Sequence, residues 1–277
     1  MRGRWTAAVA GGLALLTAVT VSACSGAEGA AAEKAVEARD YVALGDSYAA
    51  GVGAGNYGDT ECKQSKDGGY PQLWVKARAA TPFGAVTDAT CGGAVIDDVQ
   101  FNQLTELDEN TGWVTLTVGG NDAGWFSVLQ QCMFGDGATC RTSVDKAATS
   151  FETTMPARLD TLYQAIRNRA PNAKVYVAGY PHLVADPGGT GVSCDSLTDA
   201  HRKALNAGAD TLNELIKARV AAHQGFTFVD VREAFKGHEA CTREPWIHSV
   251  RDDLSESYHP TADGYQAYLK ELVAVTG

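Results

Sequence analysis

The chain has 277 residues, of which 45% are hydrophobic, and a formal net charge of −10. This length and apolar content are enough to bury a large core, which argues against a disordered protein. Because phosphate binding requires a basic face, the excess of 33 acidic over 23 basic residues argues against a nucleic-acid partner. The sequence contains no CxxC pair and no HExxH stretch, so we expect no structural or catalytic zinc site and no other metal site.

The first 23 residues have the pattern of an export signal, with two early arginines and a short, alanine-rich apolar run over 7–21. The run ends in VSAC, which resembles a bacterial lipobox, so Cys24 is a candidate for lipidation. We expect a lipoprotein on the outer face of the cytoplasmic membrane, and the open alternative is ordinary signal cleavage and secretion. Residues 24–39, which are nearly all small or charged, are expected to form a tether.

Six cysteines remain when Cys24 is set aside. An exported protein folds in an oxidising compartment, so we expect these six to form disulfides. Six cysteines allow 15 connectivities. Sequential pairing is our prediction, because each pair then closes a loop-rich excursion: Cys62 with Cys91, Cys132 with Cys140, and Cys194 with Cys241.

Strand and helix patterns alternate from residue 40 onward, which predicts a domain over 40–277. Strands that alternate with helices form a parallel sheet covered on both faces, so the fold class is α/β, a three-layer α/β/α sandwich with a mostly parallel five-stranded sheet. Runs rich in Val, Thr or aromatic residues predict the strands 41–44, 85–90, 113–118, 174–178 and 226–231.

The helical segments have the clearest periodicity near the carboxyl terminus. Apolar residues recur every three or four positions over 205–220, behind the capping box Ser196-x-x-Asp199. The last segment carries five residues on one face: Tyr265, Tyr268, Leu269, Leu272 and Val273. Stretches rich in Gly, Asp and Cys predict surface loops at 51–69, 131–141 and 181–195.

Four short islands lie just after a predicted strand or just before a predicted helix. Because the carboxyl ends of parallel strands meet at one edge of a sheet, we expect the first three islands to meet there, and a histidine on the loop before the last helix could reach the same edge. A serine activated by an imidazole, with N–H groups to hold an oxyanion, is a complete set for acyl transfer. The islands are Gly45-Asp46-Ser47, Cys91-Gly92-Gly93-Ala94, Gly119-Gly120-Asn121-Asp122 and Glu256-Ser257-Tyr258-His259-Pro260.

These islands resemble the ordered blocks of the SGNH hydrolases, also called the GDSL esterases and lipases. The blocks GDS, an isolated Gly, GxND and His-Pro follow one another over residues 45–260. With its six cysteines the chain resembles the actinobacterial branch of secreted esterases, lipases and phospholipases. The resemblance implies a flavodoxin-like fold and a serine ester hydrolase that cleaves lipid or small carboxylic esters through an acyl-enzyme, without a cofactor. We expect a monomer.

Carried over residue by residue, the resemblance implies that Ser47 is the nucleophile and that His259 is the general base. The N–H groups of Ser47 and Gly93 and the side-chain amide of Asn121 would hold the oxyanion. Gly92 is the alternative backbone donor if the alignment is displaced by one residue.

The sequence departs from the family in the residue that orients the imidazole. The family usually has an aspartate three residues before the histidine, and Glu256 stands there. Either this carboxylate or a backbone carbonyl is expected to orient His259, and Asp252 and Asp253 are weaker candidates. Because a protonated imidazole cannot accept the serine proton, we expect activity to fall as the pH drops through about 6.5.

Several residues near the islands also have structural interpretations. Asp46 is expected to bond backbone N–H groups in its loop, and Asp122 could cap the helix that follows it. Trp125 and Phe126 either line an acyl pocket or pack the core. The remaining histidines are expected to have surface or structural roles: His182, His201, His223, His238 and His248.

Two other functions remain open at this point. One is an esterase that removes acetyl groups from polysaccharides, since the fold and the blocks do not define the pocket. The other is a binding module without catalytic activity on the same scaffold. A nucleotide-binding protein is disfavoured, because Asn56 stands where a GxGxxG motif needs its last glycine.

Overall fold

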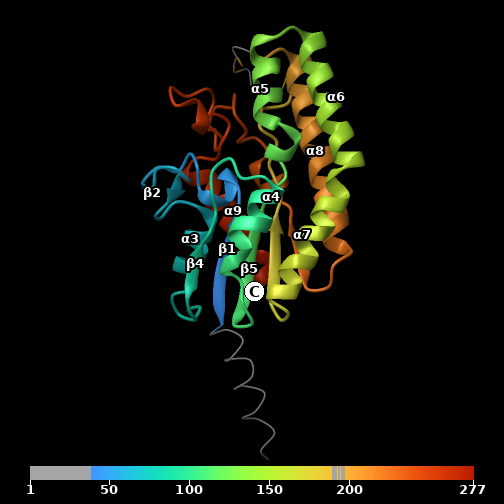
Figure 1. The fold of residues 1–277 in the computed structure, drawn as a ribbon. Coiled ribbons are helices and arrows are strands. Elements are labelled where there is room, and N and C mark those ends of the chain that lie inside the picture. Colours follow the sequence, from blue (N-terminus) through green and yellow to red (C-terminus); the bar gives the residue numbers. More distant parts are fainter. Residues whose placement is uncertain (1–38, 189–191, 193, 195–196) are drawn as a thin grey trace, which may run out of the picture. The chain divides into compact units, whose positions relative to one another are not determined.

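The computed structural model describes residues 39–188, 192, 194 and 197–277 (Figure 1). The chain divides into two units, Met1–Ala35 and Val36–Gly277. The expected export signal, Cys24 and nearly all of the expected tether lie outside the described residues, as does Ser196. All features of the fold and of the site described here belong to the second unit.

The five expected strands are present, with bounds that differ by a few residues from those predicted. They form one sheet in the order β4-β1-β5-β6-β7, in which all neighbours are parallel. The strand order reverses between β1 and β5, and ligands of such sheets bind beyond the carboxyl ends of the strands at this switch point. The strands are β1 (Asp40–Gly45), β4 (Val86–Asp88), β5 (Thr111–Thr117), β6 (Lys174–Ala178) and β7 (Phe226–Val229).

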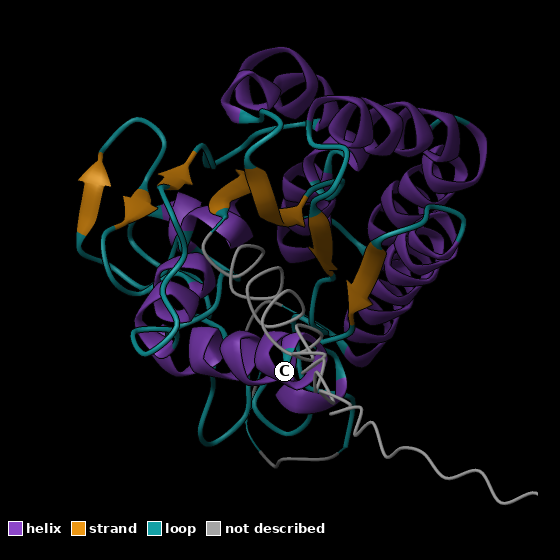
Figure 2. Cartoon of the chain, turned by 90° about the horizontal axis from the view of Figure 1, so that it is seen from below, coloured by secondary structure: helices purple, strands orange, loops and turns teal. Residues whose placement is uncertain are grey.

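Helices cover both faces of the sheet, as Figures 1 and 2 show, and this confirms the three-layer α/β/α prediction. Helices α3 and α9 pack together on one face, whereas α4, α7 and α8 lie on the other. Helices α5 and α6 form a hairpin that packs on α8. The bounds are α3 (Tyr70–Ala77), α4 (Ile96–Asp98), α5 (Trp125–Phe134), α6 (Gly137–Thr153), α7 (Met155–Arg169), α8 (Asp199–Ala221) and α9 (Ala262–Thr276).

The central strand β5 is buried along its whole length although its sequence, TGWVTLT, contains threonines. The Thr115 hydroxyl forms a 2.7 Å hydrogen bond with the hydroxyl of Tyr41, and the Thr117 hydroxyl forms a 2.9 Å bond with that of Tyr70. Buried hydroxyl groups that are paired avoid the cost of an unsatisfied polar atom. The polar residues of β5 are therefore compatible with its place in the middle of the core.

The three expected loops differ in outcome. Within 51–69, the chain forms a small antiparallel hairpin of β2 (Tyr57–Asp59) and β3 (Gln64–Ser65). The prediction for 131–141 is wrong, because most of this stretch belongs to α5 and α6. Asp136 caps α6 by accepting a 2.8 Å hydrogen bond from the Thr139 N–H, so the Gly- and Cys-rich composition marks only a tight turn between helices. Residues 181–188 are irregular apart from an isolated bridge, as predicted.

The two carboxyl-terminal helices form where expected, with differences at their edges. Helix α8 is capped by Thr198, whose side chain accepts a hydrogen bond from the backbone of the first turn. The other expected capping residue, Ser196, lies outside the described residues. On α9 the side chain of Val273 is 40% exposed, whereas four of the five predicted residues are buried or partly buried: Tyr265, Tyr268, Leu269 and Leu272. The buried face is therefore narrower than the periodicity predicts.

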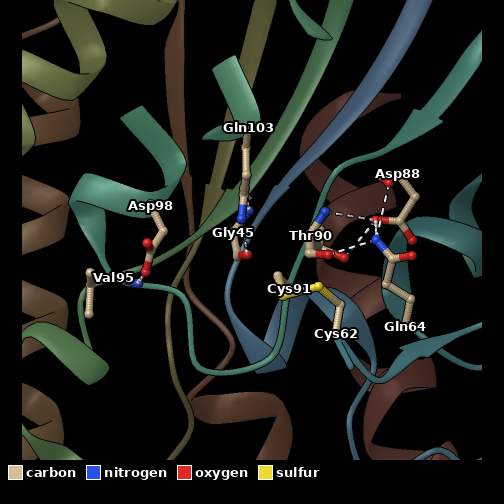
Figure 3. Close-up of a disulfide and its surroundings, with 9 residues drawn as sticks. All are labelled: Gly45, Cys62, Gln64, Asp88, Thr90, Cys91, Val95, Asp98 and Gln103. Carbon is tan, nitrogen blue, oxygen red and sulfur yellow. Dashed lines mark hydrogen bonds between the residues drawn. A yellow bond between two sulfur atoms is a disulfide. The ribbon is translucent and has the colours of Figure 1, made fainter. Parts of the chain in front are cut away.

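The structure pairs the six cysteines sequentially, as predicted: Cys62 with Cys91, Cys132 with Cys140, and Cys194 with Cys241. The first disulfide joins the β2–β3 hairpin to the turn after β4, and Figure 3 shows it beside that turn. Across the described part of the chain, every helix is too short or too polar to cross a membrane.

Candidate active site

Strand β1 ends in a sharp turn that delivers Ser47 to the carboxyl edge of the sheet. Gly45 has a φ of +129°, and a Cβ there would lie 2.2 Å from the carbonyl oxygen of Thr117 in β5, so only glycine fits. Asp46 then caps the short helix α2 (Ser47–Ala50), because its Oδ1 accepts a 3.0 Å hydrogen bond from the Tyr48 N–H. The expectation that Asp46 bonds backbone N–H groups is confirmed, and Ser47 is the first residue of the helix rather than its cap.

A buried glutamine holds this turn from the side, and the sequence did not mark it. Gln103 lies in the π-helical turn η1 (Val99–Gln103), and its side chain is 5% exposed. Its Oε1 accepts a 2.7 Å bond from the Gly45 N–H, and its Nε2 donates a 2.9 Å bond to the Gly45 carbonyl (Figure 3). Both polar groups of Gly45 are thereby satisfied, which stabilises the backbone directly before the serine.

The imidazole of His259 reaches Ser47 across the edge of the sheet. Its Nε2 lies 2.7 Å from the Ser47 Oγ, and its Nδ1 lies 3.1 Å from the carbonyl oxygen of Ser257. A carbonyl oxygen only accepts, so Nδ1 carries the proton and Nε2 is left to accept from the serine hydroxyl. This is the tautomer that a general base needs.

The structure does not support Glu256 as the residue that orients the imidazole. Its Oε1 accepts a 2.8 Å hydrogen bond from the Tyr57 hydroxyl in the β2–β3 hairpin, and its Oε2 lies 3.7 Å from the Nε of Arg251. Tyr258 has a φ of +58°, a left-handed conformation in the turn between the Ser257 carbonyl and His259. The backbone carbonyl therefore occupies the position expected for a carboxylate.

The two weaker acid candidates also point elsewhere. Asp253 forms an ion pair of 2.5 Å with Lys63, and it is the cap of the short 3-10 helix Leu254–Glu256. Asp252 is exposed. Both therefore belong to the outer surface of the loop that carries the histidine.

The ring of His259 is neutral over a wide pH range. Burial lowers the pKa of His259 to about 4, and the hydrogen bond to the Ser257 carbonyl opposes this shift only in part. Desolvation penalises the charged form of the ring. The expected transition at about 6.5 assumes an imidazole in water, whereas the desolvated ring in this structure favours a lower midpoint.

The second and third islands meet at the same cavity as Ser47. Gly93 and Asn121 both line it. Gly92 also lines it, but its N–H already donates a 2.8 Å bond to the carbonyl of Cys62, so of the two glycines Gly93 is the better oxyanion donor. Asn121 donates a 3.0 Å bond to the Ala94 carbonyl, and an amide nitrogen has a second N–H for a ligand.

Asp122 joins these two islands, and the expectation that it caps the following helix is wrong. Its side chain is 1% exposed, and both carboxylate oxygens accept from the Ile96 N–H, at 3.2 and 3.0 Å. It also forms a 2.5 Å ion pair with Arg158 of α7. The carboxylate thus caps α4, which follows the Gly92-Gly93 turn, and holds that turn beside Asn121.

A cavity of about 410 Å³ opens over Ser47. Trp125 and Phe126 both line it, and Phe126 is 51% exposed. Trp125 also packs on α8, where a Cβ at Gly208 would lie 2.5 Å from the indole, so both interpretations of Trp125 hold. The other large apolar side chains of the wall are Val52, Leu129, Leu183 and Leu212.

The other histidines lie outside this set of groups, as expected. His182 and His223 bond aspartates, at 2.9 and 3.0 Å, and His238 bonds the carbonyl of Glu244. His201 is buried, with 5% of its surface exposed. His248 has a structural role near the site, because its Nε2 lies 2.9 Å from the Gly53 carbonyl.

Comparison with known proteins gives one consistent result. The GDSL-like Lipase/Acylhydrolase family matches residues 43–267. The chain is 41% identical over 279 residues to a lipase of Streptomyces rimosus, with 100% of both chains covered, and 41% identical over 266 residues to Lipase 1 of Streptomyces coelicolor, with 95% of this chain and 96% of the relative covered.

Solved structures agree with the sequence matches. The extracellular lipase from Streptomyces rimosus superimposes with a TM-score of 0.80 at 42% identity, covering 86% of this chain and 100% of that one. Phospholipase A1 from Streptomyces albidoflavus gives a TM-score of 0.80 at 41% identity, with 86% and 99% covered. Since the family model matches residues 43–267 and the two sequence relatives align over 95–100% of the chain, the chain belongs to the GDSL-like lipase/acylhydrolase family and is a carboxylic ester hydrolase.

Proposed function

We propose that Ser47 and His259 carry the hydrolysis of the ester. The observation that carries this assignment is the 2.7 Å contact between Ser47 Oγ and His259 Nε2 at an apolar cavity. Oγ attacks the acyl carbon while its proton passes to Nε2, and the carbonyl electrons move onto the oxygen. The tetrahedral intermediate collapses as His259 returns the proton to the leaving alkoxide, which leaves an acyl-enzyme. His259 then takes a proton from a water whose oxygen attacks the acyl carbon, and returns that proton to Ser47 Oγ as the carboxylic acid leaves.

The oxyanion of this intermediate is held by the groups that meet at the cavity. We assign the backbone N–H groups of Ser47 and Gly93 and the side-chain amide of Asn121 to this role. Donors that are already in place before the charge develops stabilise the transition state without reorganisation, and the loss of one costs about 10²–10³ in kcat. The contacts of Gln103 and Asp122 support this assignment, since they hold the two turns that carry the donors.

The proposed substrate is an acyl ester of a lipid. The cavity of about 410 Å³ has large apolar walls, which suit a hydrocarbon chain. Helix α5, with the sequence WFSVLQQCMF, has no charged residue, although Phe126 and Phe134 are 51% and 74% exposed. The relatives at 41–42% identity are named lipase and phospholipase A1. An acetyl-xylooligosaccharide esterase is only 14% identical, with a TM-score of 0.51, and shares the fold alone.

The proposed place of action is outside the cytoplasm. An extracellular lipase is among the relatives, and the amino-terminal pattern is that of an export signal. Anchoring through a lipid on Cys24 is the finer proposal, and plain secretion is the alternative. Replacement of Cys24 by Ala would move the protein from the membrane fraction to the medium if Cys24 is the anchor. An unchanged distribution would favour secretion by signal cleavage.

The reaction and the substrate class can be tested together. We would measure hydrolysis of p-nitrophenyl esters from acetate to palmitate, and fatty acid release from a diacyl phospholipid, for the protein and for Ser47→Ala. The proposal predicts turnover that rises beyond acetate and disappears in the variant. A preference for acetate, with turnover of acetylated xylan, would instead support the polysaccharide esterase. Activity that survives in Ser47→Ala would overturn the assigned nucleophile.

A further inference from the structure

The cavity contains a tyrosine that the proposed chemistry does not use. Tyr180 follows β6 and is 7% exposed. Its hydroxyl donates a 2.5 Å hydrogen bond to Asp46 Oδ2 and accepts a 3.2 Å bond from the Gly120 N–H. Asp46 directly precedes Ser47, and Gly120 directly precedes Asn121. A single hydroxyl thus joins the residue before the nucleophile to the residue before the amide donor.

Tyr180 is itself held in place by both helical layers. The side chain of Asn213 in α8, which is 0% exposed, accepts a 2.9 Å bond from the Tyr180 N–H and donates a 2.8 Å bond to the Tyr180 carbonyl. The preceding carbonyl, that of Gly179, accepts a 2.8 Å bond from the Tyr268 hydroxyl of α9. With its backbone bonded on both sides, the residue presents its hydroxyl from a rigid position.

We propose that Tyr180 is a positioning residue that sets the distance between Ser47 and Asn121, and with it the geometry of the oxyanion site. This inference rests on the proposed roles of Ser47 and Asn121. Donors stabilise the oxyanion only when they lie about 2.7–3.1 Å from it. A small shift of the turn that carries Ser47 relative to the turn that carries Asn121 therefore weakens the stabilisation of the transition state. The uncharged carbonyl of the bound substrate depends less on the positions of these donors than the oxyanion does, so substrate affinity should change little.

The chemistry of Asp46 is consistent with this role. Asp46 is 1% exposed, and its carboxylate accepts hydrogen bonds from the Tyr48 N–H and the Tyr180 hydroxyl. Burial raises the pKa of Asp46 to about 7, and the bond from Tyr180 opposes that shift. The hydroxyl therefore stabilises the charged form of the side chain that caps the nucleophile helix.

The test is Tyr180→Phe, which keeps the ring and its edge-to-face contact with Tyr48 but removes the hydroxyl. We expect kcat to fall roughly tenfold to a hundredfold, with KM unchanged within about threefold. An alkyl boronic acid, which forms a tetrahedral adduct on the serine, should lose affinity by the same factor as kcat/KM. A variant that keeps wild-type kcat and boronate affinity would overturn the proposal.

A matched control is available in Tyr163→Phe. Tyr163 is buried too, at 0% exposed, but in the described part of the chain its hydroxyl has no hydrogen-bond partner. This variant should keep kcat and boronate affinity within about twofold. Equal losses in both variants would mean that a buried hydroxyl affects folding in general, and would overturn the assigned role.

A double-mutant cycle shows whether Tyr180 acts through its bond to Asp46, in the turn Gly45-Asp46-Ser47 that carries the nucleophile. In the Asp46→Asn background, Tyr180→Phe should lower kcat by a smaller factor than in the wild type, because the anionic acceptor is already gone. Strictly additive losses would contradict the inference. Ser47→Ala distinguishes a failure of this inference from a failure of the proposed function. If Ser47→Ala is inactive and Tyr180→Phe is fully active, the proposed function stands and only the positioning role of Tyr180 is wrong.

Discussion

The Nδ1 of His259 lies 3.1 Å from the carbonyl oxygen of Ser257, two residues earlier in the chain. The site thus uses a neutral backbone acceptor where a catalytic triad has a carboxylate. A carbonyl selects the tautomer as well as a carboxylate does, but it gives less stabilisation to the imidazolium that forms during the reaction. The burial of the ring makes the charged form still less favourable.

Glu256→Gln should therefore have little effect on catalysis. The carboxylate bonds Tyr57 rather than the imidazole, and Gln can accept the same hydrogen bond. We expect kcat within about threefold of wild type, whereas His259→Ala should lose roughly 10³ or more. The measurement is steady-state hydrolysis of a p-nitrophenyl ester. A loss in Glu256→Gln as large as that in His259→Ala would show that the carboxylate orients the ring in solution.

The pH profile should report the burial of His259. Only the neutral ring accepts the serine proton, and its pKa in the folded protein is about 4. We therefore expect kcat/KM to decline as the pH is lowered, with a midpoint near pH 4. Asp46 has a pKa of about 7 and could add its own transition. The profile should therefore also be recorded in Asp46→Asn, where that transition is absent. A midpoint near 6.5 in this variant would contradict the buried imidazole.

The same shift makes the protein less stable in acid. In the unfolded chain the imidazole binds a proton below about pH 6.5, whereas in the folded protein it does so only below about 4. The stability contributed by the partly buried neutral ring is present above pH 6.5 and is lost as the pH falls toward the folded pKa of about 4. Between pH 7 and pH 4, the melting temperature of His259→Phe, which lacks this titration, should decline less than that of the wild type.

Narrowing the cavity should shorten the preferred acyl chain. Ala209 lines the cavity from α8 and is 4% exposed, so the ring of Ala209→Phe would enter the space. We expect kcat/KM for an octanoate ester to fall roughly tenfold, with the value for acetate retained within about threefold. Ala207→Phe, an exposed site on the same helix, is the matched control. An unchanged chain-length profile in Ala209→Phe would mean that the acyl group binds elsewhere.

The disulfide between Cys62 and Cys91 should matter more than the one between Cys132 and Cys140. It closes a separation of 29 residues rather than 8, and cross-links over longer loops stabilise more in the chain-entropy model, about 3 kcal/mol for a 15-residue loop. The Cys91 N–H also bonds the Gly45 carbonyl next to the nucleophile turn.

We therefore expect the double serine variant of the first pair to have the lower urea midpoint and, while still folded, the lower kcat. The double serine variant of the Cys132–Cys140 pair, at the turn between α5 and α6, serves as the comparison. Equal kcat values in the two variants would argue that the hairpin disulfide has no part in organising the site.

The local pattern was sufficient to predict the strands and the candidate reactive groups. Each strand is a short apolar run, and each island stands at a strand end or before a helix, where a parallel sheet collects its functional side chains. Ser47, Gly93, Asn121 and His259 meet at the cavity because of this topology. The prediction for 131–141 is wrong because local composition was misleading there. Gly, Asp and Cys predicted a loop, but Asp136 caps a helix and a disulfide joins the two helices across the turn.

Only the tertiary structure decided between acceptors that are neighbours in the sequence. From the sequence, the Glu256 carboxylate and a backbone carbonyl are equally plausible partners for His259. In the structure the carboxylate instead bonds Tyr57, which is 199 residues away, and the carbonyl beside the ring is that of Ser257. Gln103 and Tyr180 act on the nucleophile turn from 58 and 134 residues away. Periodicity and motifs record what a residue does to its own segment, whereas contacts of this kind exist only once burial has brought distant segments together.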